Sequence, residues 1–399
     1  MNIFRLALAS LGHKKLHSFL SILLLSFSLA LIMVLFTAKD SFEKSFTRNI
    51  KGIDLVVGAK GSPLQIILSS VYHIDAPTGN ISLSEFEKLA KNRLVKKAIP
   101  LAYGDNYKGK RIVGSDSNYA ALYNVKLADG RSFQKAFEVC IGANVAQTLE
   151  LKMGSLFHGS HGFSEEGESH AQQDFKVVGI YAQSGSVIDD LILTPLASIW
   201  LAHEHPAEEA HDHDHEEVER EITAGLIQFS NPMATLSLPR QINSQTKMQA
   251  ALPAIEVNRL FSLAQSALDL LEALAYILLF IAGISIFVSL LQGLKDEEPQ
   301  LAFLRAVGIS RYKVVLLVWT KSIFLSFIAY FFALILAIIS LELLSLKLPN
   351  LTSGLGLQTL QNPMQLWLLF SVLILGTFAS LLPAWHAYRI NIPKTLADA

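Results

Sequence analysis

The stretch KDEEPQLAFLRAVGISRYK, Lys295–Lys313, decides how the chain is organised. It is charged and helix-prone, and it lies between two long apolar segments. Leu301, Leu304 and Val307 recur at helical spacing, and Phe303 falls on an adjacent face. This pattern predicts a short amphipathic helix that lies at a membrane face and turns one side toward a soluble partner.

The ends of this predicted helix carry their own signals. The acids Asp296–Glu298 would occupy its first turn, where the helix dipole favours negative charge and where Pro299 is tolerated. Gly308 would end the helix, because glycine readily adopts the left-handed conformation that closes many helices.

Four apolar segments surround this stretch and are long enough to cross a membrane. The first, Phe19–Ala38, has twenty residues without a charge, about 30 Å as a helix, which matches a bilayer core. A cleaved signal peptide is the alternative, but no small-x-small site closes this run, so we expect a retained anchor. The other three segments are Ala273–Leu294, Ser322–Leu344 and Met364–Leu382.

Composition agrees with a membrane protein that also carries a large polar part. Of the 399 residues, 51% are apolar and 17% charged, too apolar for an ordinary soluble protein and too charged for spans alone. The net charge of −1 gives no indication of nucleic acid as a partner. The single cysteine, Cys140, excludes an intrachain disulfide and is expected to be buried.

Residues 39–272 contain no further span and predict a mixed α/β domain. Five stretches have strand-like patterns: Ile53–Ala59, Arg111–Ser115, Phe137–Gly142, Phe175–Tyr181 and Leu191–Leu196. Two predict helices, Ser82–Asn92 and Ala143–Leu151. The fold class is therefore an α-helical membrane protein with four transmembrane helices and an extracytoplasmic α/β domain between the first two. Its parts are residues 1–38, 39–272 and 273–399.

Two segments of this domain leave alternatives open. Gly58–Ser62, GAKGS, lacks the spacing of a phosphate-binding loop and predicts a turn. The apolar stretch Pro63–Ile74 is either a core element or an exposed lip that meets lipid or a lipidated substrate.

The helix of the second span is expected to start before the membrane. Leucines and alanines recur at helical spacing over Glu256–Leu271, and the pattern continues without a break into Ala273–Leu294. With the extension past Ala38, this predicts a stalk of two helices under the outer domain. The alternative is that Glu256–Leu271 is a surface helix of that domain.

Basic residues beside the spans predict the orientation. Only Lys347 lies in the loop between the third and fourth spans. The tails and the middle loop hold Arg5, Lys14, Lys15, Lys295, Arg305, Arg311, Lys313, Lys321, Arg389 and Lys394. Both termini and residues 295–313 are therefore expected in the cytoplasm, and the inserted domain outside. We expect Lys321 to snorkel toward the interface at the inner end of its span.

The middles of the four spans contain no Asp, Glu, Lys, Arg or His, and Glu272 and Glu342 lie near the outer ends, which argues against a proton- or sodium-driven carrier and against an ion pore. No catalytic set has a recognisable context, so we assign no enzymatic activity to this chain. Free energy for any transport would therefore have to come from elsewhere.

A histidine-rich run is the sharpest local signal in the inserted domain. His203, His205, His211, His213 and His215 alternate with acids. Imidazole and carboxylate side chains suit Zn²⁺, although this spacing does not match a preformed structural site. The run therefore predicts either a loose zinc site or a solvated acidic loop.

The chain resembles the FtsX/MacB/LolE-type ABC permease family along nearly its whole length. Gln300–Arg311, QLAFLRAVGISR, is similar to the family segment E-I-x-x-L-R-A-x-G that follows the second span. The chain end ASLLPAWHAYRINIPKTLAD resembles the family's closing pattern at Pro383, Ala384 and Pro393. In the outer domain, Val113–Asp116, Asp129–Phe133 and Ile141–Ser155 follow the order of its periplasmic core domain.

The resemblance implies a homodimer, or a dimer with a similar permease, bound to a separate cytoplasmic ATPase that holds the ATP and Mg²⁺. It implies that Leu301, Phe303, Leu304, Arg305 and Gly308 couple that ATPase to the outer domain. A departure is Gln300 in place of the usual glutamate, after three acids where bases are common. The cargo would be a lipoprotein, a lipid or another hydrophobic substrate.

Two alternative functions stay open at this point. One is a zinc-linked ABC system that uses the histidine run, and the other is a non-transporting regulator of a periplasmic hydrolase, which would be an outer partner of the chain.

Overall fold

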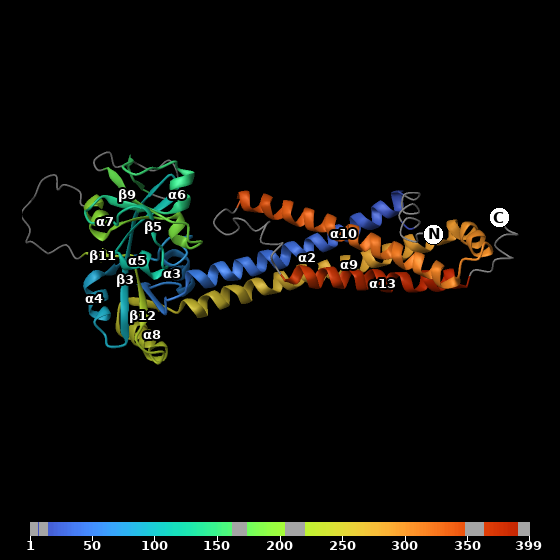
Figure 1. Cartoon of the computed structure of the whole chain (residues 1–399). Coiled ribbons are helices and arrows are strands. Elements are labelled where there is room, and N and C mark those ends of the chain that lie inside the picture. Colours follow the sequence, from blue (N-terminus) through green and yellow to red (C-terminus); the bar gives the residue numbers. More distant parts are fainter. Residues whose placement is uncertain (1–6, 8–14, 162–173, 204–219, 348–362, 390–399) are drawn as a thin grey trace, which may run out of the picture. The chain divides into compact units, whose positions relative to one another are not determined.

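The computed structural model describes residue 7 and residues 15–161, 174–203, 220–347 and 363–389 (Figure 1). The chain divides into two compact units. We call Met1–Glu43 together with Ala264–Ala399 the membrane unit, and Lys44–Leu263 the inserted unit. Four helices are long and apolar enough to cross a membrane: Ser18–Asn49, Pro253–Ala306, Arg311–Leu344 and Met364–Tyr388. The predicted fold class, with a mixed α/β domain between the first and second of them, is confirmed.

The second of these helices, α9 (Pro253–Ala306), is a single helix of 54 residues. It begins directly after the last strand of the inserted unit and passes through the apolar window of the second span. At 1.5 Å per residue it is roughly 80 Å long, far more than the ~30 Å of a bilayer core. The predicted continuous helix is confirmed, and the alternative of a separate surface helix is wrong.

A separate amphipathic helix starting near Lys295 was also predicted, and this prediction is wrong. Residues 295–306 continue α9, with Pro299 inside the helix. A proline there lacks the N–H that would bond to the carbonyl of Lys295. Leu294, Leu301 and Ala302 are all buried in one cluster on the two sides of Pro299, and this packing holds the helix together.

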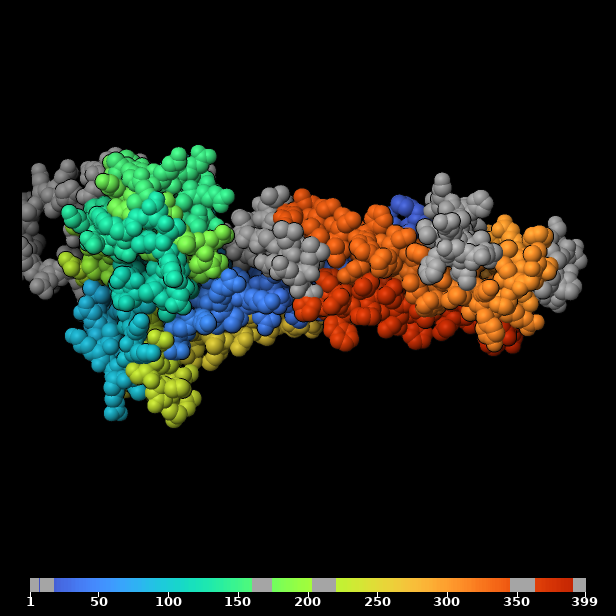
Figure 2. Space-filling model, viewed as in Figure 1, coloured from blue at the N-terminus to red at the C-terminus, as the bar shows by residue number. Residues whose placement is uncertain are grey.

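The membrane unit packs around small residues. Helices α2 (Lys15–Asn49), α9, α10 (Arg311–Lys347) and α13 (Met364–Tyr388) share one apolar core. Helix α10 lies against α13, and their surfaces adjoin in the space-filling view (Figure 2). Ser322 Oγ donates a hydrogen bond of 2.6 Å to the carbonyl of Gly376. Small residues allow such close helix contacts in membrane proteins.

We expect Gly376→Ala to lower the stability of the membrane unit. A Cβ at this position would lie 2.3 Å from Ser326 Oγ, so one of the two helices must shift. Overpacking of this kind costs about 1–3 kcal/mol. Thermal unfolding of the purified chain in detergent measures the effect. The matched control is Gly283→Ala, whose Cβ would lie 3.4 Å from Leu375, an ordinary contact. Equal stability of the two variants would contradict the packing described.

The inserted unit is built on an eleven-stranded mixed sheet. Nine strands follow the order β13-β1-β12-β3-β4-β10-β6-β9-β5, and β7 and β8 pair with β9 and β3. The long strand β3 pairs with β12 on one side and β4 on the other, so it joins the two halves of the sheet. A separate ribbon pairs β11 with β2.

The elements of the inserted unit have the following bounds. The strands are β1 (Leu55–Ala59), β2 (Ile81–Ser82), β3 (Val95–Tyr107), β4 (Lys110–Ser115), β5 (Leu127–Gly130), β6 (Glu138–Ile141), β7 (Leu156–Phe157), β8 (Ser160–His161), β9 (Phe175–Tyr181), β10 (Ile192–Pro195), β11 (Glu221–Ile222), β12 (Ala224–Phe229) and β13 (Met248–Ala251). The helices are α3 (Pro63–Ser70), α4 (Leu83–Ala90), α5 (Asn118–Leu122), α6 (Ala143–Thr148), η1 (Val187–Asp190), α7 (Leu196–His203) and α8 (Ala234–Gln245).

All five strands and both helices predicted for the inserted unit are present as β1, β4, β6, β9, β10, α4 and α6. Ser82 caps α4, because its side chain accepts a hydrogen bond from the Glu85 amide. The alternative for Pro63–Ile74 is settled in favour of a core element, since Ile66 and Ile67 of α3 are buried. Cys140 is buried, as predicted.

Candidate functional site

The end of α9 forms a compact turn that leads directly into α10. Gly308 has φ +104°, the left-handed conformation predicted for it. Its amide donates to the carbonyl of Arg305 at 3.0 Å, and the amide of Ile309 donates to the carbonyl of Leu304 at 3.1 Å. These two bonds define a Schellman motif, which satisfies carbonyls that the end of a helix leaves unpaired. Leu304 and Ile309 pack against the same apolar cluster, the contact that usually accompanies this motif.

The apolar side chains of this segment divide into a buried and an exposed set. Leu301 is 3% exposed and packs with residues of α10 and α13. In contrast, Phe303 is 62% exposed, Val307 71% and Tyr312 76%. We call these three residues the docking surface. Such a group of exposed large apolar side chains marks a contact with another molecule or with lipid.

Val307 keeps its helical spacing from Leu301 and Leu304, since its amide donates to the carbonyl of Phe303 at 3.0 Å, but its side chain is exposed while that of Leu301 is buried. The chain turns directly after it, at Gly308. Of the other predicted coupling residues, Leu304 and Arg305 are half-buried and Gly308 forms the turn. Tyr312 was not expected in this surface, because it lies beyond Gly308, where the predicted helix and its spacing end. Its ring lies 6.1 Å from that of Tyr388 at the end of α13.

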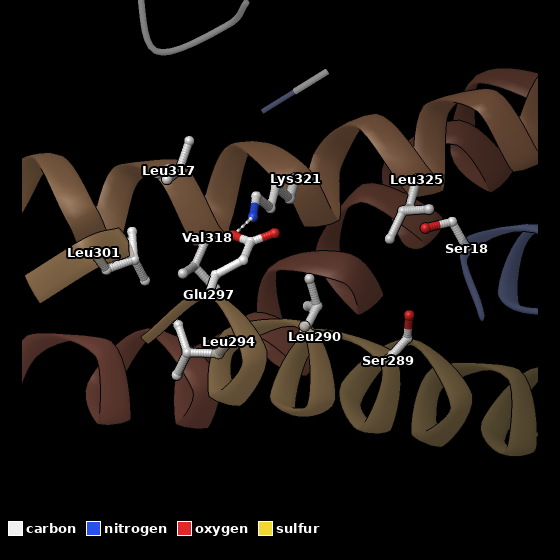
Figure 3. A pocket seen from close by; sticks show the side chains of 11 residues that line it. Ser18, Ser289, Leu290, Leu294, Glu297, Leu301, Leu317, Val318, Lys321 and Leu325 are labelled. Carbon is white, nitrogen blue, oxygen red and sulfur yellow. Dashed lines mark hydrogen bonds and ion pairs between the residues drawn. The ribbon is translucent and has the colours of Figure 1, made fainter. Parts of the chain in front are cut away.

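A small crevice lies beside this segment, between α9 and α10 (Figure 3). Lys321 Nζ points into it and forms an ion pair of 2.5 Å with Glu297 Oε2. The other walls are mainly apolar side chains, among them Leu294, Leu301 and Leu325. Water cannot solvate the ammonium group well here, so the carboxylate of Glu297 supplies the compensating charge.

The expectation that Lys321 snorkels toward the interface is therefore wrong. Lys321 is only 7% exposed, and its partner comes from the preceding helix, 24 residues away in sequence. Glu297 belongs to the acidic run that we had assigned to a first helical turn. Because this glutamate is needed inside the protein, the acids after Lys295 do not mark a helix start.

The last turn of α2 is fixed to the inserted unit by several hydrogen bonds. Tyr72 Oη donates to the carbonyl of Phe46 at 3.0 Å, and Tyr123 Oη to the carbonyl of Asn49 at 3.2 Å. Asn49 Oδ1 in turn accepts from the amide of Val187 at 3.1 Å. Terminal carbonyls of a helix lack intrahelical donors, and here tyrosine hydroxyls take that role. These pairings leave no pattern in the sequence, since the partners are far apart along the chain.

A half-buried histidine of the same unit, His73, is paired with a tyrosine. His73 Nε2 and Tyr119 Oη are 2.6 Å apart, and Tyr103 Oη donates to the carbonyl of Ser69. Burial, aided by the charge of Arg111, lowers the pKa of His73 to about 3, so the ring is neutral at physiological pH.

The predicted zinc site lies outside the described residues. His203 is the last residue of α7, and nothing is described of its side chain, while His205, His211, His213 and His215 belong to an undescribed range. Among residues that the structure does describe, no three His, Cys, Asp or Glu side chains are grouped to hold a metal ion. The zinc hypothesis stays a prediction.

The fold and the segment after the second span define a multi-pass membrane protein of the permease class. A family model for the MacB-like periplasmic core domain matches residues 18–236, more than half of the chain, and one for the FtsX-like permease C-terminal domain matches residues 273–392. The chain belongs to this family of ABC transporter permeases. Its members are generally non-enzymatic membrane subunits that work with a cytoplasmic ATPase.

Two solved structures are similar to part of the chain. The periplasmic region of MacB from Actinobacillus actinomycetemcomitans aligns with a TM-score of 0.36 and 13% identity, over 54% of this chain and 97% of that one. The extracellular domain of the noncanonic ABC-type transporter YknZ from Gram-positive bacteria aligns with a TM-score of 0.31 and 13% identity, over 50% of this chain and 98% of that one. No curated protein matches the chain.

Proposed function

We propose that this chain is the transmembrane subunit of an ATP-driven ABC transporter of the mechanotransmission or export type. The observation that carries the proposal is the unbroken helix α9. It starts beside β13 in the inserted unit and ends at the docking surface. A rigid helix of this length can transmit a displacement at one end to the other, whereas a flexible linker cannot.

The orientation in the proposal follows from the basic residues that flank the spans. Residues 295–313 and both termini lie in the cytoplasm of a bacterial inner membrane, and the inserted domain lies outside. The working division is 1–38, 39–272 and 273–399. The boundaries of the compact units fall inside α2 and α9, so these two helices belong to both parts. A second permease copy, identical or similar, completes the membrane part.

In the proposed complex Phe303 contacts the separate ATPase subunit, together with Val307 and Tyr312. Four residues position this surface. Three of them are buried or half-buried, Leu301, Leu304 and Arg305, and the fourth, Gly308, forms the turn. The likeness to this permease family implies a lipoprotein, a lipid or another hydrophobic molecule as the cargo class, and the middles of the spans carry no ionisable relay for ions.

Co-purification tests the ATPase contact. We expect the full chain, extracted from its native host, to bring down an ABC ATPase, and Phe303→Asp to lose it. An aspartate at an exposed docking position removes apolar contact and adds an unpaired charge, which costs about 2–4 kcal/mol, roughly 30-fold or more in affinity.

The matched control is Leu236→Asp, which makes the same change at a 65% exposed leucine of α8 in the inserted unit. We expect this variant to retain the ATPase. If Phe303→Asp retains it equally well, or if no ABC ATPase accompanies the wild-type chain, the proposed function is wrong. Mass spectrometry of the captured band identifies the partner by its nucleotide-binding motif.

A further inference from the structure

The inserted unit contains a cavity of about 390 Å³ that is lined by cations. Its walls come from the end of α2 and the turn after it, from strands β3 and β12, and from the segments beside α5 and η1. The polar residues in these walls are Arg48, Lys51, Lys97, Asn124 and Gln228, together with two serines. This volume lies in the range of small-ligand pockets.

The charge in this cavity is unbalanced. Three cations line it, and none of its lining residues is acidic. Throughout the described ranges, Lys51 and Lys97 have no carboxylate within the 4.0 Å of an ion pair. The nearby Asp189 is buried, and its oxygens accept hydrogen bonds from Ser184 and Gly185. Like charges held close together repel one another, so a bound anion would stabilise the arrangement.

The backbones that carry the donors of the cavity are ordered, while the side chains of Arg48, Lys51 and Lys97 are exposed. Lys97 on β3 and Gln228 on β12 are directly paired residues of an antiparallel ladder, and both side chains line the cavity. Arg48 is fixed because its Nη1 donates to the carbonyl of Gly185 at 3.0 Å. Lys51 follows in a turn. The next residue, Gly52, has φ +85°, and a Cβ added at this glycine would lie 3.2 Å from Leu122. The ordered backbone and the fixed guanidinium group of Arg48 lower part of the entropic cost of binding a ligand.

We propose that this cavity binds a phosphate-bearing anion. Two ammonium groups, a guanidinium group and two amide side chains match the several oxygens of a phosphate better than the two of a carboxylate. The volume exceeds that of inorganic phosphate alone and accommodates a phosphate with a small organic group attached. The headgroup of an anionic phospholipid and a free phosphate ester share this chemistry.

Binding to the purified full chain in non-ionic detergent tests the proposal with two probes. Glycerol 3-phosphate is titrated by calorimetry, and dioleoylphosphatidylglycerol is titrated in mixed micelles and followed by native mass spectrometry. We expect at least one probe to bind the wild type and to bind Lys51→Gln/Lys97→Gln about 10-fold more weakly or worse, because two charge-assisted hydrogen bonds are lost. Higher salt weakens binding as well.

The matched control is Lys91→Gln/Lys96→Gln, which removes two exposed lysines of the same unit that do not line the cavity. Lys96 is the neighbour of Lys97 in β3, and alternate residues of a strand face opposite sides. Binding of the lipid alone identifies a membrane headgroup, and binding of both probes identifies a free phosphate ester. The proposal is overturned if neither probe binds the wild type, or if both double variants weaken binding equally.

Discussion

Replacing Ala267 by proline is expected to stop ATP-driven movement of the inserted unit while ATP hydrolysis by the partner continues. Ala267 is an exposed residue of α9 that follows the boundary between the two units. A proline inside a helix removes one hydrogen bond, clashes with the preceding turn and costs about 3 kcal/mol or more. It commonly kinks the helix by more than ~20°. A helix broken here can no longer act as a lever, although the docking surface at its far end is unchanged.

The measurement uses two spin labels on one chain, at Lys152→Cys in the inserted unit and Leu366→Cys in α13, both at exposed positions. The native Cys140 is buried, and burial raises the pKa of its thiol, so the labels go to the introduced cysteines. The label-to-label distance is compared with and without ATP and Mg²⁺ in the presence of the ATPase. We expect a nucleotide-dependent change that Ala267→Pro abolishes.

The control at the same site is Ala267→Leu, which adds side-chain volume at an exposed position but keeps the backbone hydrogen bonds of the helix. This variant should retain the distance change and the ATPase activity. A persistent distance change in Ala267→Pro would show that α9 does not carry the motion. Loss of ATPase stimulation in that variant would instead show that the break reaches the docking surface.

The membrane spans and the continuous α9 could be predicted because both depend on local properties. A run of twenty apolar residues has few other stable placements than a bilayer, and an uninterrupted helical spacing extends through Glu256–Leu294. The same holds for β1, β4 and β9, whose apolar stretches are short and bounded by turn residues. In each case a residue's neighbours in sequence decide its structure.

The long strand β3 could not be predicted on these grounds. It contains Lys96, Lys97 and Pro100, and its register with β4 shifts between Tyr103 and Asn106. A bulge breaks the alternation of side chains on which strand prediction relies. The same limit applies to Lys97 with Gln228 and to Tyr123 with Asn49, since pairing across the fold leaves no pattern in the sequence.

The acidic run Asp296–Glu298 shows how a correct local rule can give a wrong result. Acids before a proline favour a helix start, but Glu297 has a buried cation to neutralise on α10. A tertiary contact therefore outweighs a preference worth about 0.3–1 kcal/mol. The structure replaces a predicted helix start with an ion pair that fastens the end of α9 to α10.

The ion pair itself gives the second large effect. We expect Glu297→Gln or Lys321→Met alone to destabilise the membrane unit by about 3–5 kcal/mol, because the first leaves the ammonium group of Lys321 uncompensated among leucines and the second removes the cation that Glu297 neutralises. The double variant should recover much of that loss, since no buried charge then remains. Denaturant titration of the purified chains in detergent gives the free energy of unfolding of the wild type, the two single variants and the double variant, which together form a double-mutant cycle.

The cycle separates the ion pair from a general effect of charge. Lys295→Gln removes one exposed charge from the same helix, two residues from Glu297, and should change stability by less than about 0.5 kcal/mol. If the losses of Glu297→Gln and Lys321→Met simply add in the double variant, the two side chains do not interact. If they do interact, the crevice beside Leu301 is a firm link between α9 and α10. A motor that pushes on the docking surface would then move both helices together, and the spans would transmit the push as one body.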